Sequence, residues 1–278
     1  MNQITLNYYP GGKTKAVTMS YDDGQIHDRR LVEIFNRYGI RGTFHLNSSR
    51  LDTPGFVTAA ELPGLYRGHE ISLHTQTHPT FAFVPPQAQI REITEDRLAL
   101  EKHAGYVVNG LSYPMGSYDA ATVERLRNLG ILYARTTKAT GGFALPDDFL
   151  LWHPTLHHTR GKAIYEVDRT VLMQKAVEYS EYPAWLGNMT VLYVWGHSYE
   201  FENDGTWDVM EEFCAYISQN RDIWFATNME IYNYVTAVRA LRFSADCSMV
   251  YNPSALAVTV GVNGKPTTIP GGATVTLG

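Results

Sequence analysis

The sequence predicts an α/β fold, a distorted (β/α) barrel of about seven parallel strands with a small C-terminal β appendage. Short apolar runs alternate with segments of helical periodicity as far as residue 242. Such alternation is typical of parallel βα units rather than of a β-sandwich. From residue 243 onward the helical periodicity stops, and short β-like runs are separated by turn residues.

Seven short runs rich in apolar and β-branched residues are predicted as strands. In chain order they are Lys15–Tyr21, Gly42–Leu46, Glu70–His74, Leu111–Tyr113, Tyr133–Thr137, Val191–Trp195 and Ile223–Ala226. Helices are predicted between them, because apolar residues recur there at spacings of three and four. In order they cover 31–38, Thr58–Tyr66, Pro86–His103, a segment capped by Asp119, Tyr165–Ser180, Trp207–Gln219 and Asn228–Leu241. The region 140–160 is expected to be irregular.

We expect two units, a barrel at residues 1–242 and a β appendage at residues 243–278. Asn263 and Gly264 separate two β-like runs of the appendage, and Asn-Gly between such runs is a strong hairpin signal. A segment of about 35 residues is too short for a core of its own. The appendage should therefore pack on the barrel.

Composition excludes several classes of protein. The 278 residues include 23 Lys and Arg against 28 Asp and Glu, a net charge of −5 with no basic stripe, so neither nucleic acid nor an anionic membrane is an expected partner. No apolar run approaches the ~20 residues of a membrane span. The first ten residues lack the basic and apolar regions of an export signal. We expect a cytoplasmic protein, or a secreted one if such a signal has been removed.

The candidate functional residues each follow a predicted strand. Asp22 and Asp23 end the first strand, His74 and His78 follow the third, and His197 follows the sixth. Because all strands of a βα barrel end on one face, where active sites are built, we expect these side chains to converge.

Two imidazoles four residues apart and one carboxylate would form a three-ligand metal site with an open position. Zinc suits this ligand set, and cobalt or nickel could bind it as well. Taken singly, His-x3-His also fits two ordinary histidines, and Asp-Asp-Gly fits a solvated turn. His197 fits either a core histidine or a general acid. His157 and His158 are expected in a loop or at the surface.

Taken together, these residues resemble the polysaccharide deacetylase family (carbohydrate esterase family 4) between residues 16 and 238. The family's first motif, Thr-Phe/Tyr-Asp-Asp-Gly, is similar to Ser20–Gly24. This resemblance implies that Asp22 is the general base and Asp23 a metal ligand. The second motif, His-Ser/Thr-x-Ser/Thr-His-Pro, matches His74–Pro79 at every position and implies that both of its histidines bind the metal.

The remaining motifs are less complete. The third, Arg-x-Pro-Tyr/Phe-Gly, resembles Ser112–Gly116. Ser112 replaces the arginine that in the family braces the catalytic aspartate. Met115 replaces the aromatic residue, and the resemblance implies that its backbone N–H helps to hold the oxyanion. The acidic fourth motif is not found, and only Trp152 lies in its region. The fifth resembles Leu192–His197 and implies that His197 is the general acid. The aromatic residues at these motifs are candidates for lining a sugar pocket, although each also fits the core: Tyr21, Tyr113, Trp152 and Trp195.

The resemblance implies a metal-dependent hydrolase that removes N- or O-linked acetyl groups from a carbohydrate. In it, Asp22 as base takes a proton from metal-activated water, which attacks the acetyl carbonyl, and His197 acts as acid. Two alternatives stay open. A metal-dependent amidase acting on a small non-sugar amide or imide is favoured by the lack of an export signal. A non-catalytic carbohydrate-binding protein on the same barrel is favoured by the incomplete third and fourth motifs. The sugar and the oligomeric state are not predicted.

Overall fold

A computed structural model describes residues 2–160, 166–183 and 188–278. Its centre is a curled, parallel half-barrel sheet in the order β6-β5-β4-β3-β2-β8-β7. An eighth strand, β9, pairs with the first residues of β2. The strands are β2 (Lys15–Asp23), β3 (Gly42–Leu46), β4 (Glu70–Leu73), β5 (Gly110–Ser112), β6 (Tyr133–Arg135), β7 (Leu156–His157), β8 (Thr190–His197) and β9 (Ile223–Phe225). This confirms the predicted α/β fold with its parallel strands, and the distorted barrel is a curled half-barrel.

Strand β2 lies at the centre of the sheet, and its residues between Lys15 and Asp22 are uncharged and mostly apolar or small. All but the last of its nine residues are buried, as expected for a parallel strand covered on both sides. It pairs with β8 from Lys15 to Asp22 and with β3 from Met19 to Asp23. The carboxyl ends of β2, β3 and β8 therefore lie together.

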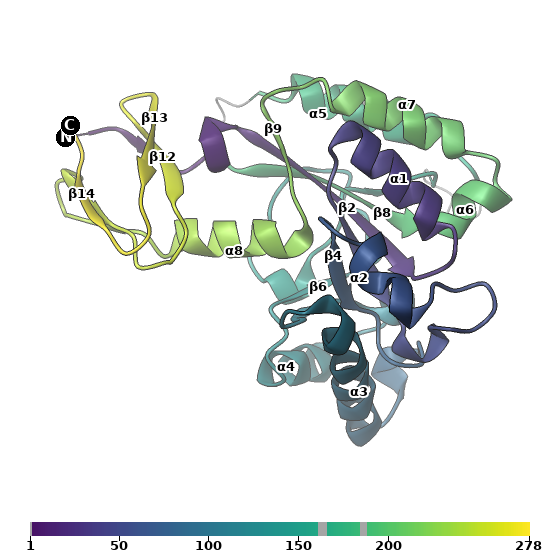
Figure 1. Ribbon diagram of the computed structural model, residues 1–278. Coiled ribbons are helices and arrows are strands. Elements are labelled where there is room, and N and C mark those ends of the chain that lie inside the picture. Colours follow the sequence, from purple (N-terminus) through teal and green to yellow (C-terminus); the bar gives the residue numbers. More distant parts are fainter. Residues whose placement is uncertain (1, 161–165, 184–187) are drawn as a thin grey trace.

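Eight α-helices in the described part of the chain flank the sheet, with α1, α5 and α7 on one side and α3 and α4 beyond β4 and β6 (Figure 1). They are α1 (Asp28–Tyr38), α2 (Leu62–Leu65), α3 (Pro86–Ala104), α4 (Ala120–Asn128), α5 (Val171–Glu181), α6 (Ser198–Asn203), α7 (Trp207–Ile217) and α8 (Asn228–Arg239). Two predicted helix ends are confirmed. Gly39 caps α1 with φ of 66°, and the Asp119 carboxylate accepts from the Thr122 N–H at the start of α4.

The appendage consists of two small antiparallel sheets. One joins β1 (Ile4–Thr5), β12 (Val258–Val262) and β13 (Lys265–Ile269), and the other joins β10 (Arg242–Phe243), β11 (Met249–Tyr251) and β14 (Thr274–Thr276). Asn263 and Gly264 form the predicted hairpin turn with φ of 53° and 79°. The strand β1, from the range 1–242, thus pairs with the C-terminal segment, and the two termini lie side by side (Figure 1).

Helix α8 connects the appendage to the sheet. Its Val235 and Val238 belong to one apolar cluster with Val258 and Val260 of β12 and with Ala16 of β2. Burial of this shared cluster explains why so short a β segment is ordered. No helix in the described ranges is long and apolar enough to cross a membrane.

Two sequence expectations need correction or restriction. The region 140–160 is not wholly irregular, because Leu156–His157 forms strand β7 beside β8. The helix predicted from Tyr165 is seen as α5 from Val171 onward, and its predicted start at Tyr165 lies outside the described residues.

Candidate metal and catalytic site

The predicted site residues converge at the carboxyl end of the sheet. In the strand register, Asp22 of β2 is paired with His197 of β8. His74 directly follows β4, and its ring reaches Ser112 at the end of β5. The curl of the sheet therefore brings together residues that are up to 175 positions apart in the chain (Asp22 to His197).

Asp23, His74 and His78 present three ligand atoms to one point. The Asp23 Oδ1 atom lies 3.6 Å from His74 Nε2 and 3.8 Å from His78 Nε2, and all three atoms lie within 4.8 Å of one another. Nδ1 of His74 lies 2.9 Å from the Ser112 carbonyl oxygen, which can only accept, so Nδ1 carries the proton and Nε2 keeps its lone pair. Burial lowers the pKa of His74 even though Asp22 and Asp23 oppose this. The ring is thus a neutral, oriented ligand.

The backbone at this cluster is held in an unfavourable conformation. Asp23, Thr75 and His78 have φ of 80°, 65° and 60°, the left-handed region that costs non-glycine residues of order 1–3 kcal/mol each. Such outliers gather where the surrounding structure enforces a functional geometry. Their position on the two ligand segments is what a metal site would require.

A second carboxylate, Asp22, stands beside this cluster without belonging to it. Arg135 of β6 donates to its Oδ2 atom, and the Ser112 hydroxyl donates to Oδ1 at 3.1 Å. Oδ2 also lies 3.7 Å from His74 Nε2. Burial alone would raise the pKa of Asp22, but the Arg135 guanidinium, with smaller contributions from nearby histidines, holds it well below its usual range. Asp22 is therefore an ionised, fixed base.

On the other side of Asp22, His197 is paired with Glu200 from the first turn of α6. The Glu200 Oε2 atom lies 3.2 Å from His197 Nδ1 and accepts from the His197 backbone N–H at 2.9 Å. Burial lowers the pKa of His197, but its interaction with Glu200 outweighs burial, and the net pKa is raised. A raised pKa favours the charged form of the imidazole, which is the form that can donate a proton.

The other predicted site residues are placed as follows. Met115 lies in a tight turn with φ of 55° and is 71% exposed at the rim, and its role as a backbone donor stays a prediction. Tyr21, Tyr113 and Trp152 are almost fully buried in the core, so they offer no open ring face to a sugar. Trp195 lines a cavity of about 260 Å³ together with His157, Arg160, His197 and Glu200, and it alone of the four aromatic candidates keeps a place beside the site.

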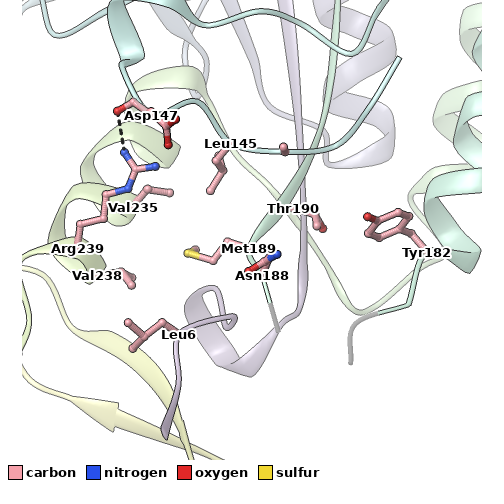
Figure 2. A pocket seen from close by; sticks show the side chains of 11 residues that line it. Leu6, Leu145, Asp147, Tyr182, Asn188, Met189, Thr190, Val235, Val238 and Arg239 are labelled. Atoms are coloured by element: carbon pink, nitrogen blue, oxygen red, sulfur yellow. Dashed lines mark hydrogen bonds between the residues drawn. The ribbon is translucent and has the colours of Figure 1, made fainter. Parts of the chain in front are cut away.

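A second cavity, of about 420 Å³, lies at the opposite end of β8. Leu6, Leu145, Met189, Val238 and Arg239 are among the side chains around it, together with Thr190 at the start of that strand (Figure 2). None of the candidate site residues lines it. The candidate residues of the described chain thus lie at the other end of the sheet from this cavity.

Comparison with known proteins identifies the family. The sequence profile described as polysaccharide deacetylase matches residues 10–134, the segment that supplies Asp22, Asp23, His74 and His78. Over these residues the chain is a distant member of the polysaccharide deacetylase family. This family consists of metal-dependent carbohydrate deacetylases.

The polysaccharide deacetylase assignment is accompanied by partial similarity to curated proteins. The chain is 30% identical over 118 residues to "Putative polysaccharide deacetylase YheN" of Bacillus subtilis, which is 41% of this chain and 40% of that protein. It is 23% identical over 129 residues to "Peptidoglycan-N-acetylglucosamine deacetylase PgdA" of Listeria monocytogenes, 45% of this chain and 27% of the relative. The match thus spans less than half of each relative's length.

Solved structures of the polysaccharide deacetylase fold cover more of the chain. A "putative polysaccharide deacetylase from Mycobacterium smegmatis" superposes with a TM-score of 0.66 and 19% identity over 85% of this chain and 96% of the other. A family 4 acetyl xylan esterase from Clostridium thermocellum, in complex with a cobalt ion, does so with a TM-score of 0.50 and 19% identity over 78% and 90%. At these identities the similarity establishes the fold.

Two residues that sequence reasoning missed fill the gaps in the polysaccharide deacetylase motifs. Arg135, from β6 rather than from the third motif, holds Asp22. Glu200, three positions after His197, holds that histidine in place of an acid from the fourth motif. The expectation that His157 and His158 lie in a loop or at the surface is wrong, since His158 is fully buried and His157 is 8% exposed beside Glu200. The spacing of Glu200 from His197 was a usable signal, whereas nothing in the chain order pointed to Arg135.

Proposed function

We propose that this protein is a metal-dependent hydrolase that removes acetyl groups, N- or O-linked, from a carbohydrate. The observation that carries the proposal is the division of labour between two adjacent carboxylates. Asp23 faces both imidazoles, while Asp22 lies near His74 alone and accepts hydrogen bonds from Arg135 and Ser112. A ligand and a base side by side are what metal-assisted hydrolysis needs.

Asp23, His74 and His78 fit a divalent metal ion. Two oriented imidazole nitrogens and one carboxylate oxygen suit zinc, cobalt or nickel and leave positions for water and substrate. When bound, such an ion acidifies water and polarises a carbonyl oxygen. The related acetyl xylan esterase that holds a cobalt ion supports this choice of metals.

The remaining roles belong to the side chains around that point. Asp22, ionised and fixed on both oxygens, accepts the proton of the attacking water. The Met115 N–H stabilises the oxyanion that develops on the acetyl group. His197, kept charged by Glu200, donates a proton to the departing amine or hydroxyl. Without that proton an amine is a very poor leaving group.

The structure supports a hydrolase over a non-catalytic sugar-binding protein. The incomplete third and fourth motifs were the reason to consider a binding protein, and Arg135 and Glu200 supply the two partners that those motifs lack. A binding protein has no use for a base and a proton donor that are each held by a carboxylate ion pair. The choice between a sugar and a small non-sugar amide is left to the assay.

The test uses the full chain, stripped of metal and reloaded with zinc or cobalt. We expect acetate release from acetylated chito- or xylo-oligosaccharides. Asp22→Asn should keep the metal and lose turnover, whereas Asp23→Asn should lose both. Hydrolysis of small amides or imides without any acetate release from saccharides would replace the proposal by the amidase. Full activity of Asp22→Asn would contradict the base assignment.

A further inference from the structure

A second group of histidines and one carboxylate lies next to His197, between β7 and α6. The Glu200 Oε2 atom is 3.0 Å from His157 Nε2 and 3.4 Å from His158 Nε2. These three ligand atoms lie within 4.8 Å of one another, and all three residues are buried. Glu200 comes from the first turn of α6, while the two histidines come from the end of β7.

The 3.4 Å between Glu200 Oε2 and His158 Nε2 matches the distance between two ligands of one ion, whereas the 3.0 Å between Oε2 and His157 Nε2 is a hydrogen-bond distance. An ion bound at about 2.0–2.2 Å in tetrahedral geometry keeps its ligand atoms about 3.3–3.6 Å apart. Both ring nitrogens of His158 are buried without a hydrogen-bond partner, even though Oε2 is 3.4 Å from Nε2. Two ligand atoms that share an ion lie close together, but their lone pairs point at the ion and not at each other. This is how Glu200 Oε2 and His158 Nε2 lie. The Asp23–His74–His78 group shows the same proximity, at 3.6 and 3.8 Å.

The fold makes special room for the His158 ring. The ring is stacked on Phe201 at 4.0 Å and faces Tyr21 at 5.6 Å between centroids. Gly196 is required beside it, because a Cβ atom at that position would lie 2.1 Å from His158 Nδ1. A buried polar group without a partner costs about 1–3 kcal/mol, which an apolar ring would avoid. A bound ion would give Nε2 a partner and offset that cost.

The charges around the group can accommodate a dication. Burial lowers the pKa of both His157 and His158, which favours the neutral form of each ring. Nδ1 of His157 accepts from the Thr159 N–H at 3.4 Å, so the proton of the neutral ring is on Nε2, and an ion at this point would displace that proton. Arg160 approaches the other oxygen of Glu200, Oε1, at 3.5 Å and is itself paired with Asp204 at 2.8 Å. Oε2 accepts from the His197 backbone N–H and faces the three imidazoles. The cavity of about 260 Å³ that His157, His197 and Glu200 line gives a route from solvent.

We infer that His157, His158 and Glu200 form a second site for a divalent transition-metal ion, separate from the Asp23–His74–His78 site. His197 Nδ1 lies 3.2 Å from the same Oε2 atom, so an ion at this site competes with His197 for Glu200. The second site therefore fills at higher metal concentration than the first. On the proposed function, filling it removes the partner of the proton donor and inhibits the enzyme.

The experiment is a metal titration of the metal-free full chain with Co²⁺ and Zn²⁺, followed by calorimetry and by cobalt absorption. We expect two ions per wild-type chain, one in His158→Phe and one in Asp23→Asn. His157→Gln, at the cavity edge, serves as a second variant if His158→Phe does not fold, and retention of the first ion with an unchanged circular dichroism spectrum shows that either variant is folded. A single ion in the wild type, or two ions in both histidine variants, overturns the inference.

An activity arm separates this inference from the proposed function. Excess Zn²⁺ should inhibit the wild type at least tenfold and leave His158→Phe active. Two bound ions with no hydrolase activity at any metal concentration would contradict the proposed function and support the second site. An active enzyme that binds one ion and resists excess zinc would contradict the second site and support the proposed function.

Discussion

The Arg135 guanidinium donates to the Asp22 carboxylate across the interior of the curled sheet, from a strand that lies four places away in the sheet order. Both side chains are buried, and the Trp195 ring lies against the guanidinium with 4.4 Å between Cζ and the ring centroid. A buried arginine in this position can only be tolerated because its charge is matched. The pair thus ties the fold of the half-barrel to the ionisation of the base.

Arg135→Met should therefore reduce both turnover and stability. Loss of one partner of a buried ion pair costs about 3–5 kcal/mol of stability. Turnover should fall by about 100-fold or more, the equivalent of about 3 kcal/mol, because Asp22 loses its orientation and its ionisation is no longer favoured. Binding of the first metal ion should persist, since Arg135 contacts none of its three ligands. Steady-state kinetics, metal content and urea unfolding measure the three effects.

Arg135→Lys is the matched control. It keeps the charge and loses the planar geometry, so activity should lie between that of the wild type and that of Arg135→Met. Wild-type turnover in Arg135→Met would show that Asp22 does not need this partner.

The sequence was sufficient for the order of strands and for the five residues that follow them. Asp22, Asp23, His74, His78 and His197 could be placed together because all parallel strands of a βα unit end on one side. Arg135 could not be placed, since its contact with Asp22 depends on how far the sheet curls and on which face of the three-residue strand β6 it occupies.

The same limit applies to the histidines at the end of β7. A two-residue strand gives no periodicity to read, so His157 and His158 looked like residues of a polar loop. Their burial follows from the pairing of β7 with β8, a tertiary contact that brings them to Glu200.

Glu200→Gln should change the pH dependence of the reaction. In the wild type, burial lowers the pKa of His197, but Glu200, with smaller contributions from Asp22 and Asp23, raises it by more. The proton donor therefore stays charged to a higher pH than an unpaired histidine. The neutral amide removes this support, and the alkaline limb of the kcat/KM profile should move to lower pH. Substrates with amine leaving groups should lose more rate than activated aryl esters, which need no proton. An unmoved alkaline limb would show that Glu200 does not act through His197.

Asp28→Asn tests a buried carboxyl beneath the site. Asp28 accepts from the hydroxyls of Tyr66 and Ser198, and burial raises its pKa to about 7. A raised carboxyl pKa means that the folded chain binds the proton more tightly than the unfolded one. The stability it contributes is complete below about pH 4 and is lost as the pH rises through 7. The unfolding free energy of Asp28→Asn should therefore fall less between pH 5 and pH 8 than that of the wild type, as measured by urea unfolding. Equal slopes in the two proteins would rule out this role for Asp28.

Gly196→Ala tests the packing that places His158 beside Glu200. The added Cβ would lie 2.1 Å from His158 Nδ1 and 2.3 Å from Cε1, and the ring cannot yield easily because Phe201 and Tyr21 hold its faces. Overpacking of this kind costs about 1–3 kcal/mol, so the midpoint of urea unfolding should fall.

Gly64→Ala is the control, since a Cβ at that helical position meets nothing within 4 Å and should be neutral or stabilising. The double variant Gly196→Ala/His158→Ala should lose less stability than the sum of the single variants, because removing the ring removes the clash. Additive losses would show that the two residues are not in conflict and that the position of the His158 ring does not depend on the glycine.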